Sequence, residues 1–67
     1  MSKREVKAYL IRVVCSYGVV DKKDLFLMAR KHGFDTTDPN FRSALLDLDE
    51  DDILDVGLTY VRCIGEV

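Results

Sequence analysis

The chain has 67 residues, of which 48% are hydrophobic and 33% are charged, and its formal net charge is −2. This length allows one domain at most, and the composition is typical of a globular rather than a disordered chain. No apolar run reaches the roughly 18–20 residues of a membrane span, and the N-terminus lacks the continuous apolar core of a signal peptide. We therefore predict a single cytoplasmic domain, residues 1–67, that has no contact with a membrane.

The charges are divided unevenly between the two halves of the chain. Residues 1–33 contain eight Lys and Arg but only three Asp and Glu. Residues 34–67 contain two Lys and Arg and nine Asp and Glu. This asymmetry is the most unusual feature of the composition.

The first helix has clear start and stop signals. Ser2, followed three residues later by Glu5, is typical of a capping box, and Gly18 provides a C-terminal stop. Apolar residues recur between them at helical spacing. We therefore predict a helix over residues 3–16. Its apolar stripe is Val6, Tyr9, Leu10, Val13, Val14 and Tyr17.

The second helix is preceded by Val19-Val20, a short pair of strand-forming residues. The side chain of Asp21 can cap this helix, and Gly33 ends it. We therefore predict a helix over residues 22–32. Its apolar stripe is Leu25, Met28, Ala29 and His32.

The third helix begins at Asp38-Pro39, because proline favours the first helical position, and we predict that it covers residues 39–49. Residues 53–56 and 59–64 are rich in strand formers, and Gly57 between them suits a hairpin turn. The sequence therefore predicts an α+β domain of three helices followed by a two-stranded β-hairpin. The apolar stripe of the third helix is Phe41, Ala44, Leu45 and Leu48.

The two cysteines, Cys15 and Cys63, are too few for a disulfide-rich secreted scaffold. We therefore predict two free thiols. An internal disulfide stays the alternative, which would be natural in an oxidising compartment or in the cytosol of a hyperthermophile.

The order helix, short strand, helix, turn, helix and hairpin resembles the winged helix-turn-helix family. Three segments carry the resemblance, which covers nearly the whole chain. It implies a DNA-binding regulator of transcription, whose third helix enters the major groove while the second crosses the backbone and the hairpin touches an adjacent groove. The segments are Leu45-Leu46-Asp47-Leu48 at the end of the third helix, Asp52-Ile53-Leu54 at the entry to the wing, and Tyr60-Val61 on the returning strand.

The resemblance implies double-stranded DNA as the partner and places the contacts near the starts of the second and third helices. Arginine suits a guanine edge and asparagine an adenine edge, while lysines at a helix N-terminus can hold phosphates. A continuous positive strip through Lys22, Lys23, Arg30 and Arg42 would favour this function. The candidate nucleic-acid-binding residues are Lys22, Lys23, Thr36, Thr37, Asn40, Arg42 and Ser43.

Other features favour a protein-interaction module on the same scaffold. Asp47 and Glu50 on the third helix would repel phosphates, and the predicted wing tip, residues 56–58, has no Lys or Arg. The partner would have a basic surface, or it would be a second copy, as a homodimer or in a head-to-tail contact. The candidate interface residues are Ala8, Ile11, Cys15, Leu27, Leu46, Asp47 and Glu50, of which the first three form an apolar strip.

We predict no enzymatic activity, no cofactor and no metal site. No serine or cysteine lies in a nucleophile signature, and there is no phosphate-binding glycine loop. Asp47-x-Asp49-x-Asp51 is similar to the start of a calcium-binding loop, but Asp52 replaces the required glycine and Leu58 the bidentate glutamate.

Overall fold

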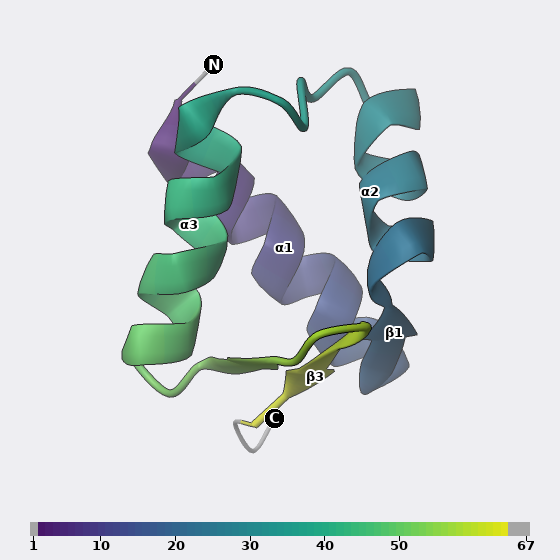
Figure 1. The fold of residues 1–67 in the computed structure, drawn as a ribbon, viewed down its shortest axis with the longest axis vertical. Coiled ribbons are helices and arrows are strands. Elements are labelled where there is room, and N and C mark those ends of the chain that lie inside the picture. The colour runs from purple at the N-terminus through teal and green to yellow at the C-terminus, as the bar shows by residue number, and fades with distance from the viewer. Residues whose placement is uncertain (1, 65–67) are drawn as a thin grey trace.

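The computed structural model describes residues 2–64, which form three helices and three strands (Figure 1). The three predicted helices are confirmed, with ends that differ from the prediction by at most one residue. The elements in chain order are α1 (Lys3–Tyr17), β1 (Val19–Asp21), α2 (Lys22–Lys31), α3 (Pro39–Glu50), β2 (Leu54–Val56) and β3 (Tyr60–Cys63).

Each helix begins at a polar side chain that accepts a hydrogen bond from a backbone N–H of the first turn. Ser2 accepts from Glu5 at 3.5 Å, Asp21 from Lys23 at 2.9 Å, and Asp38 from Asn40 at 2.8 Å. These contacts satisfy donors that have no partner within the helix. At the other end of α1, Gly18 has a φ of 85°, a left-handed conformation that suits glycine and turns the chain into β1.

The sheet has three antiparallel strands in the order β1-β3-β2. The predicted hairpin is present as β2 and β3, but the prediction of a sheet with only these two strands is wrong, because β1 pairs with β3. Val20 of β1 and Val56 of β2 both lie opposite Val61 of the central strand. The strand-forming pair after the first helix was recognised in the sequence, but its partner lies about forty residues further on. Local patterns do not encode such long-range pairing, which depends on how the helices fold back.

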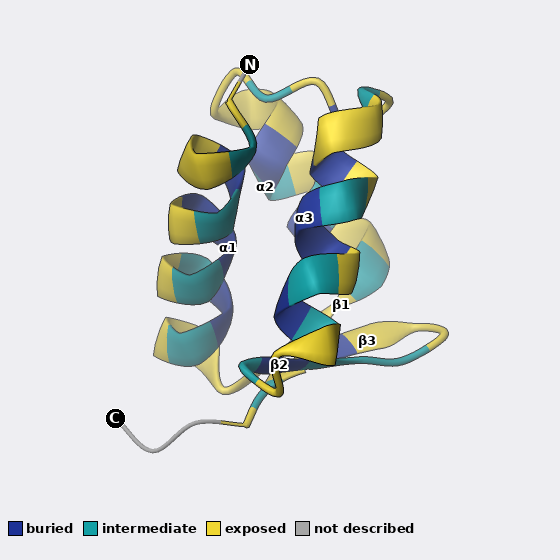
Figure 2. Ribbon diagram, turned by 90° about the vertical axis from the view of Figure 1, so that its left-hand side faces the viewer, coloured by how far each residue is buried: buried dark blue, intermediate teal, exposed yellow. Residues whose placement is uncertain are grey.

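The core lies between the inward faces of the three helices and one face of the sheet (Figure 2). All three predicted stripes contribute to it, with two exceptions. Tyr17 is 66% exposed because α1 ends there, and His32 is exposed beyond the last turn of α2, where its ring lies 5.1 Å from the ring of Tyr9. The buried apolar residues are Val6, Tyr9, Leu10, Val14, Val20, Leu25, Ala29, Phe41, Ala44, Leu45, Leu48, Leu54 and Val61.

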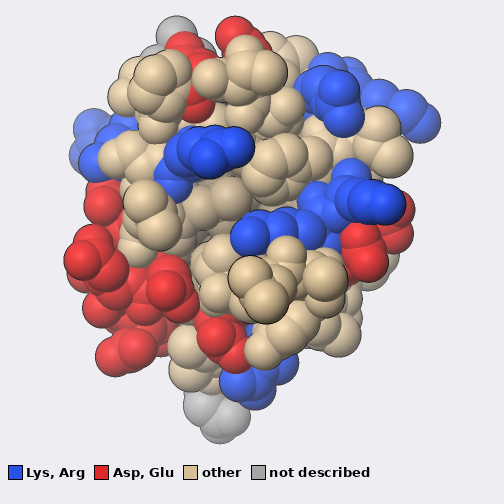
Figure 3. All heavy atoms as spheres, viewed as in Figure 1, with Lys and Arg blue, Asp and Glu red and all other residues tan. Residues whose placement is uncertain are grey.

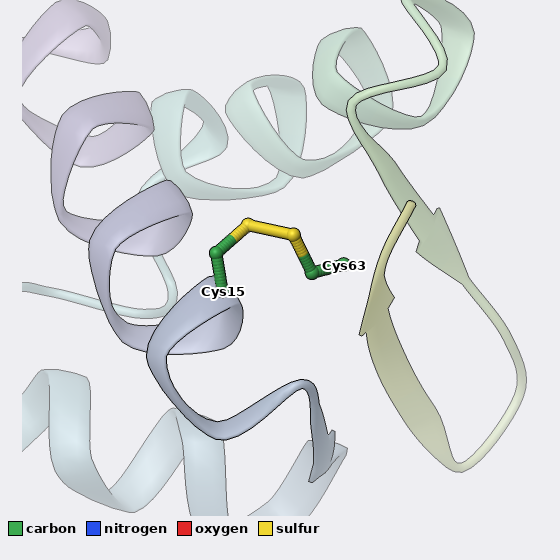
Figure 4. The surroundings of a disulfide bond; sticks show 2 residues. All are labelled: Cys15 and Cys63. Atoms are coloured by element: carbon green, nitrogen blue, oxygen red, sulfur yellow. A yellow bond between two sulfur atoms is a disulfide. The ribbon is translucent and has the colours of Figure 1, made fainter. Parts of the chain in front are cut away.

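A disulfide joins Cys15 of α1 to Cys63 of β3, with 4.9 Å between the Cα atoms (Figure 4). The prediction of two free thiols is therefore wrong. The pairing depends on the central strand lying beside α1, which the sequence alone does not reveal. Disulfides are rare in most cytosols, so the cytoplasmic prediction requires a cytosol such as that of a hyperthermophile.

Candidate nucleic-acid interface

An open groove of about 630 Å³ lies between α2 and the turn of the β2–β3 hairpin. We call it the α2–hairpin groove. The start of α2 is fixed to the hairpin because the backbone N–H of Lys22 donates to the carbonyl of Thr59 at 2.8 Å. The groove combines basic and apolar side chains. Its lining residues are Asp21, Lys22, Lys23, Phe26, Leu27, Arg30, Leu58 and Thr59.

Lys22 was predicted to contact phosphate, but its ammonium group is used within the fold. Its Nζ donates to the carbonyl oxygen of Gly57 at 3.0 Å in a partly buried contact. A side chain held in this way positions the hairpin turn against α2. The neighbouring Lys23 and Arg30 are exposed, so they are better placed to meet an anion in solvent.

The predicted contact residues around the start of α3 fall into two groups. Thr36 is only 8% exposed, so its assignment as a DNA contact is wrong: the turn before α3 folds this side chain inward. Thr37 is exposed, and its hydroxyl donates to Asp35 at 2.6 Å. This bond, together with one from the Thr37 backbone N–H at 3.0 Å, holds the pKa of Asp35 below its usual value.

On α3 itself, Asn40 and Arg42 are exposed and Ser43 is half-buried. Arg42 lies in the first turns of the helix, one residue after the buried Phe41. Of the predicted base contacts on α3, Arg42 is therefore the one that is both positively charged and exposed.

The charges on the face that holds α2, α3 and the hairpin are separated (Figure 3). Lys and Arg atoms lie in several separate patches, the largest on the right-hand side and smaller ones at the upper left, the left edge and the bottom, with uncharged atoms between them. Asp and Glu atoms gather at the lower left, where α3 ends. The continuous positive strip that would favour DNA is therefore interrupted.

Asp47, predicted to contact a partner, forms ion pairs within the chain. Its Oδ2 lies 2.6 Å from Nζ of Lys3 and 3.2 Å from Nζ of Lys7, both on α1. These two lysines hold the pKa of Asp47 below its usual value. The carboxylate thus joins the end of α3 to the start of α1 instead of standing free for a partner.

Two more acidic side chains of this region have partners in the fold. Asp49 accepts a hydrogen bond from the backbone N–H of Val56 on β2 at 3.2 Å. Asp55 forms an ion pair with Arg62 on the adjacent strand at 3.0 Å. Part of the acidic cluster is therefore structural, while Glu50, Asp51 and Asp52 are exposed.

The predicted apolar strip on the first helix is not an exposed face. Ala8 is exposed, but Ile11 and Cys15 are partly buried against the core, and Cys15 is in the disulfide. The three residues therefore do not form one exposed strip, and their assignment to a partner interface stays a prediction. The wheel of a single helix could not show that β3 packs beside this part of α1.

Large exposed apolar side chains lie elsewhere. Leu27 of α2 and Leu46 of α3 are exposed, as predicted. Leu58 at the hairpin turn is 95% exposed, and sequence reasoning noted only that the turn lacked basic residues. A Cβ at position 57 would lie 2.5 Å from Cε2 of Tyr60, so a larger residue there would require the Tyr60 ring to move.

No protein-family model, curated protein or solved structure matches this chain. Residues 2–64 contain no cluster of His, Cys, Asp or Glu that could hold a metal ion. No helix in that range is long and apolar enough to cross a membrane.

Proposed function

We propose that this domain is a small winged helix-turn-helix protein that binds double-stranded DNA and regulates transcription. The order of its elements, with a short strand between the first two helices and a hairpin after the third, is the order of that family. In such proteins the third helix enters the major groove and the hairpin lies over an adjacent groove.

The observation that carries the proposal is the exposure of Arg42 near the start of α3, together with Lys23 and Arg30 on α2. An arginine near the start of a recognition helix can make a bidentate contact with guanine. Cations on the neighbouring helix can neutralise phosphates. Asn40 and Ser43 are the nearest polar side chains on α3 that could complete the contact.

The test is a fluorescence-anisotropy titration of a labelled duplex at low salt, repeated across salt concentrations. We expect Arg42→Ala to weaken binding by about 1–3 kcal/mol and to relax sequence preference. Lys23→Ala and Arg30→Ala should each reduce the salt slope by about one unit. Arg4→Ala, which removes an exposed arginine from α1, is the matched control. Absence of binding at tens of micromolar protein would refute the proposal.

A second candidate is a protein-interaction module that binds a basic partner through α3. It is favoured by the exposure of Leu46 and Glu50, which lie one helical turn apart. The DNA titration separates the two candidates. Glu50→Gln should strengthen DNA binding, because it removes a negative charge that repels phosphate. The same change should weaken the binding of a basic partner.

A further inference from the structure

The two edge strands of the sheet are protected differently. At the β2 edge, the N–H of Val56 is covered by the carboxylate of Asp49. This is one way in which proteins prevent a sheet edge from pairing with another chain. No side chain in the described residues covers the β1 edge in a comparable way.

The register shows which backbone groups the β1 edge presents. The N–H of Cys63 donates to the carbonyl of Gly18, and the N–H of Lys22 donates to the carbonyl of Thr59, each at 2.8 Å. Because hydrogen-bonded pairs alternate in an antiparallel ladder, the N–H and C=O groups of Val19 and Asp21 point away from β3. Asp21 also caps α2, so its carbonyl accepts the first hydrogen bond of that helix. The edge therefore offers two donors, the N–H groups of Val19 and Asp21, and one acceptor, the carbonyl of Val19.

A second groove, of about 450 Å³, lies between this edge and α2. We call its surface the β1–α2 face and define it by Tyr17, Val19, Asp24, Leu27, Met28 and Lys31. Tyr17, Val19 and Leu27 are 66%, 56% and 50% exposed, so an apolar surface adjoins the open edge.

The charges of this face are arranged to complement a second copy of itself. Asp24, Leu27 and Lys31 share one side of α2, because residues three, four and seven apart lie on the same helical face. If two α2 helices pack in antiparallel directions around Leu27, Asp24 of each copy lies opposite Lys31 of the other. A second copy of the chain carries this complementary arrangement of charges without any further requirement.

We propose that the β1–α2 face binds a second copy of this chain across a two-fold axis. β1 of one copy pairs with β1 of the other in antiparallel fashion, with Val20 opposite Val20. The N–H of Asp21 in each copy then donates to the carbonyl of Val19 in the other, which gives two hydrogen bonds across the axis. The two sheets become continuous, and the two α2 helices lie side by side.

This contact does not use the basic side chains of the α2–hairpin groove, although Asp21 and Leu27 line both grooves. Lys23 and Arg30 lie on the groove side of α2, whereas Asp24, Met28 and Lys31 lie on the side of the β1–α2 face. The inference does not depend on DNA binding. If the domain does bind DNA, the dimer presents two α3 helices related by the same axis, as two-fold half-sites require.

The test is sedimentation equilibrium of the full chain without DNA, over a range of concentrations. The chain has a mass of 7.7 kDa, and we expect a species of twice that mass. Asp24→Lys and Lys31→Asp, each alone, should raise the dimer dissociation constant by at least about tenfold, because each places like charges opposite one another. An equimolar mixture of these two variants should restore dimers, since each opposing pair is then of opposite sign.

Val19→Lys tests the strand edge independently and should also favour the monomer. Leu46→Lys, an equally drastic change of an exposed apolar residue on α3, is the matched control and should leave the mass unchanged. Circular dichroism confirms that each variant is folded. The proposal is overturned if the chain stays monomeric at millimolar concentration. It is also overturned if the Asp24→Lys and Val19→Lys variants are folded and still form dimers.

Discussion

Residues 2–33 and residues 34–64 carry opposite net charges, and the fold uses those charges in different ways. In the acidic part, Asp47, Asp49 and Asp55 each have a partner within the chain. In the basic part, Lys23, Arg30 and Lys31 on α2 are exposed. The structure thus uses much of the acidic cluster for contacts within the chain and leaves positive charge exposed on α2.

Several contacts also join the two parts to one another. The disulfide connects α1 to β3, Lys3 and Lys7 reach Asp47, and Lys22 reaches the hairpin turn. Attraction between the halves therefore accounts for part of the charge asymmetry. An acidic run in a small domain is not by itself a sign of a partner, because its carboxylates can be satisfied by the same chain.

The largest expected effect comes from breaking the covalent link between the two parts. Cys15→Ser should lower the free energy of unfolding by about 4 kcal/mol, because the disulfide closes a long loop in the unfolded chain; the cysteines are 48 residues apart. Urea denaturation at neutral pH measures the loss. A reducing agent should destabilise the parent chain and leave the Cys15→Ser variant unaffected. Equal stability of parent and variant under oxidising conditions would exclude a structural role for the bond.

The next effect tests whether an acidic side chain stabilises the sheet. Asp49→Ala should cost about 1–2 kcal/mol and speed hydrogen exchange at the Val56 amide, because that N–H loses its acceptor. Asp51→Ala is the control, since Asp51 is exposed and lies two residues further along. If both variants lose stability equally, the effect is one of net charge and not of the bond to Val56.

The smallest expected effect is the pH dependence that Asp47 contributes. Its pKa lies below the usual 3.8 in the folded chain, because Lys3 and Lys7 favour the ionised form. This stabilisation is therefore fully present above that usual value and is lost as the pH falls through the lower, folded-state pKa. Asp47→Asn should reduce stability at pH 7 and have less effect near pH 2. Denaturation at both pH values measures the difference, and an effect that grows on acidification would contradict the ion pairs.

The sequence determined the helices of this domain almost completely. The helix starts are indicated by Ser2, Asp21 and Asp38-Pro39, and the spacing of apolar residues identifies the faces that form the core. These signals act within one or two helical turns, so a local pattern contains them. The candidate site was less predictable. Arg42 and Lys23, two of the candidate DNA contacts, are exposed, whereas the burial of Thr36 and the internal use of Lys22 were not expected.

Only the tertiary structure decided the contacts between distant parts of the chain. It brought β1 into the sheet beside β3, joined Cys15 to Cys63, and set Lys3 and Lys7 against Asp47. Each of these contacts closes a loop of about forty residues, and its partners are chosen by how the three helices pack. Helix signals are local, so they can be identified residue by residue along the sequence. Strand order, disulfide pairing and the partner of each charged side chain are decided only when the core forms.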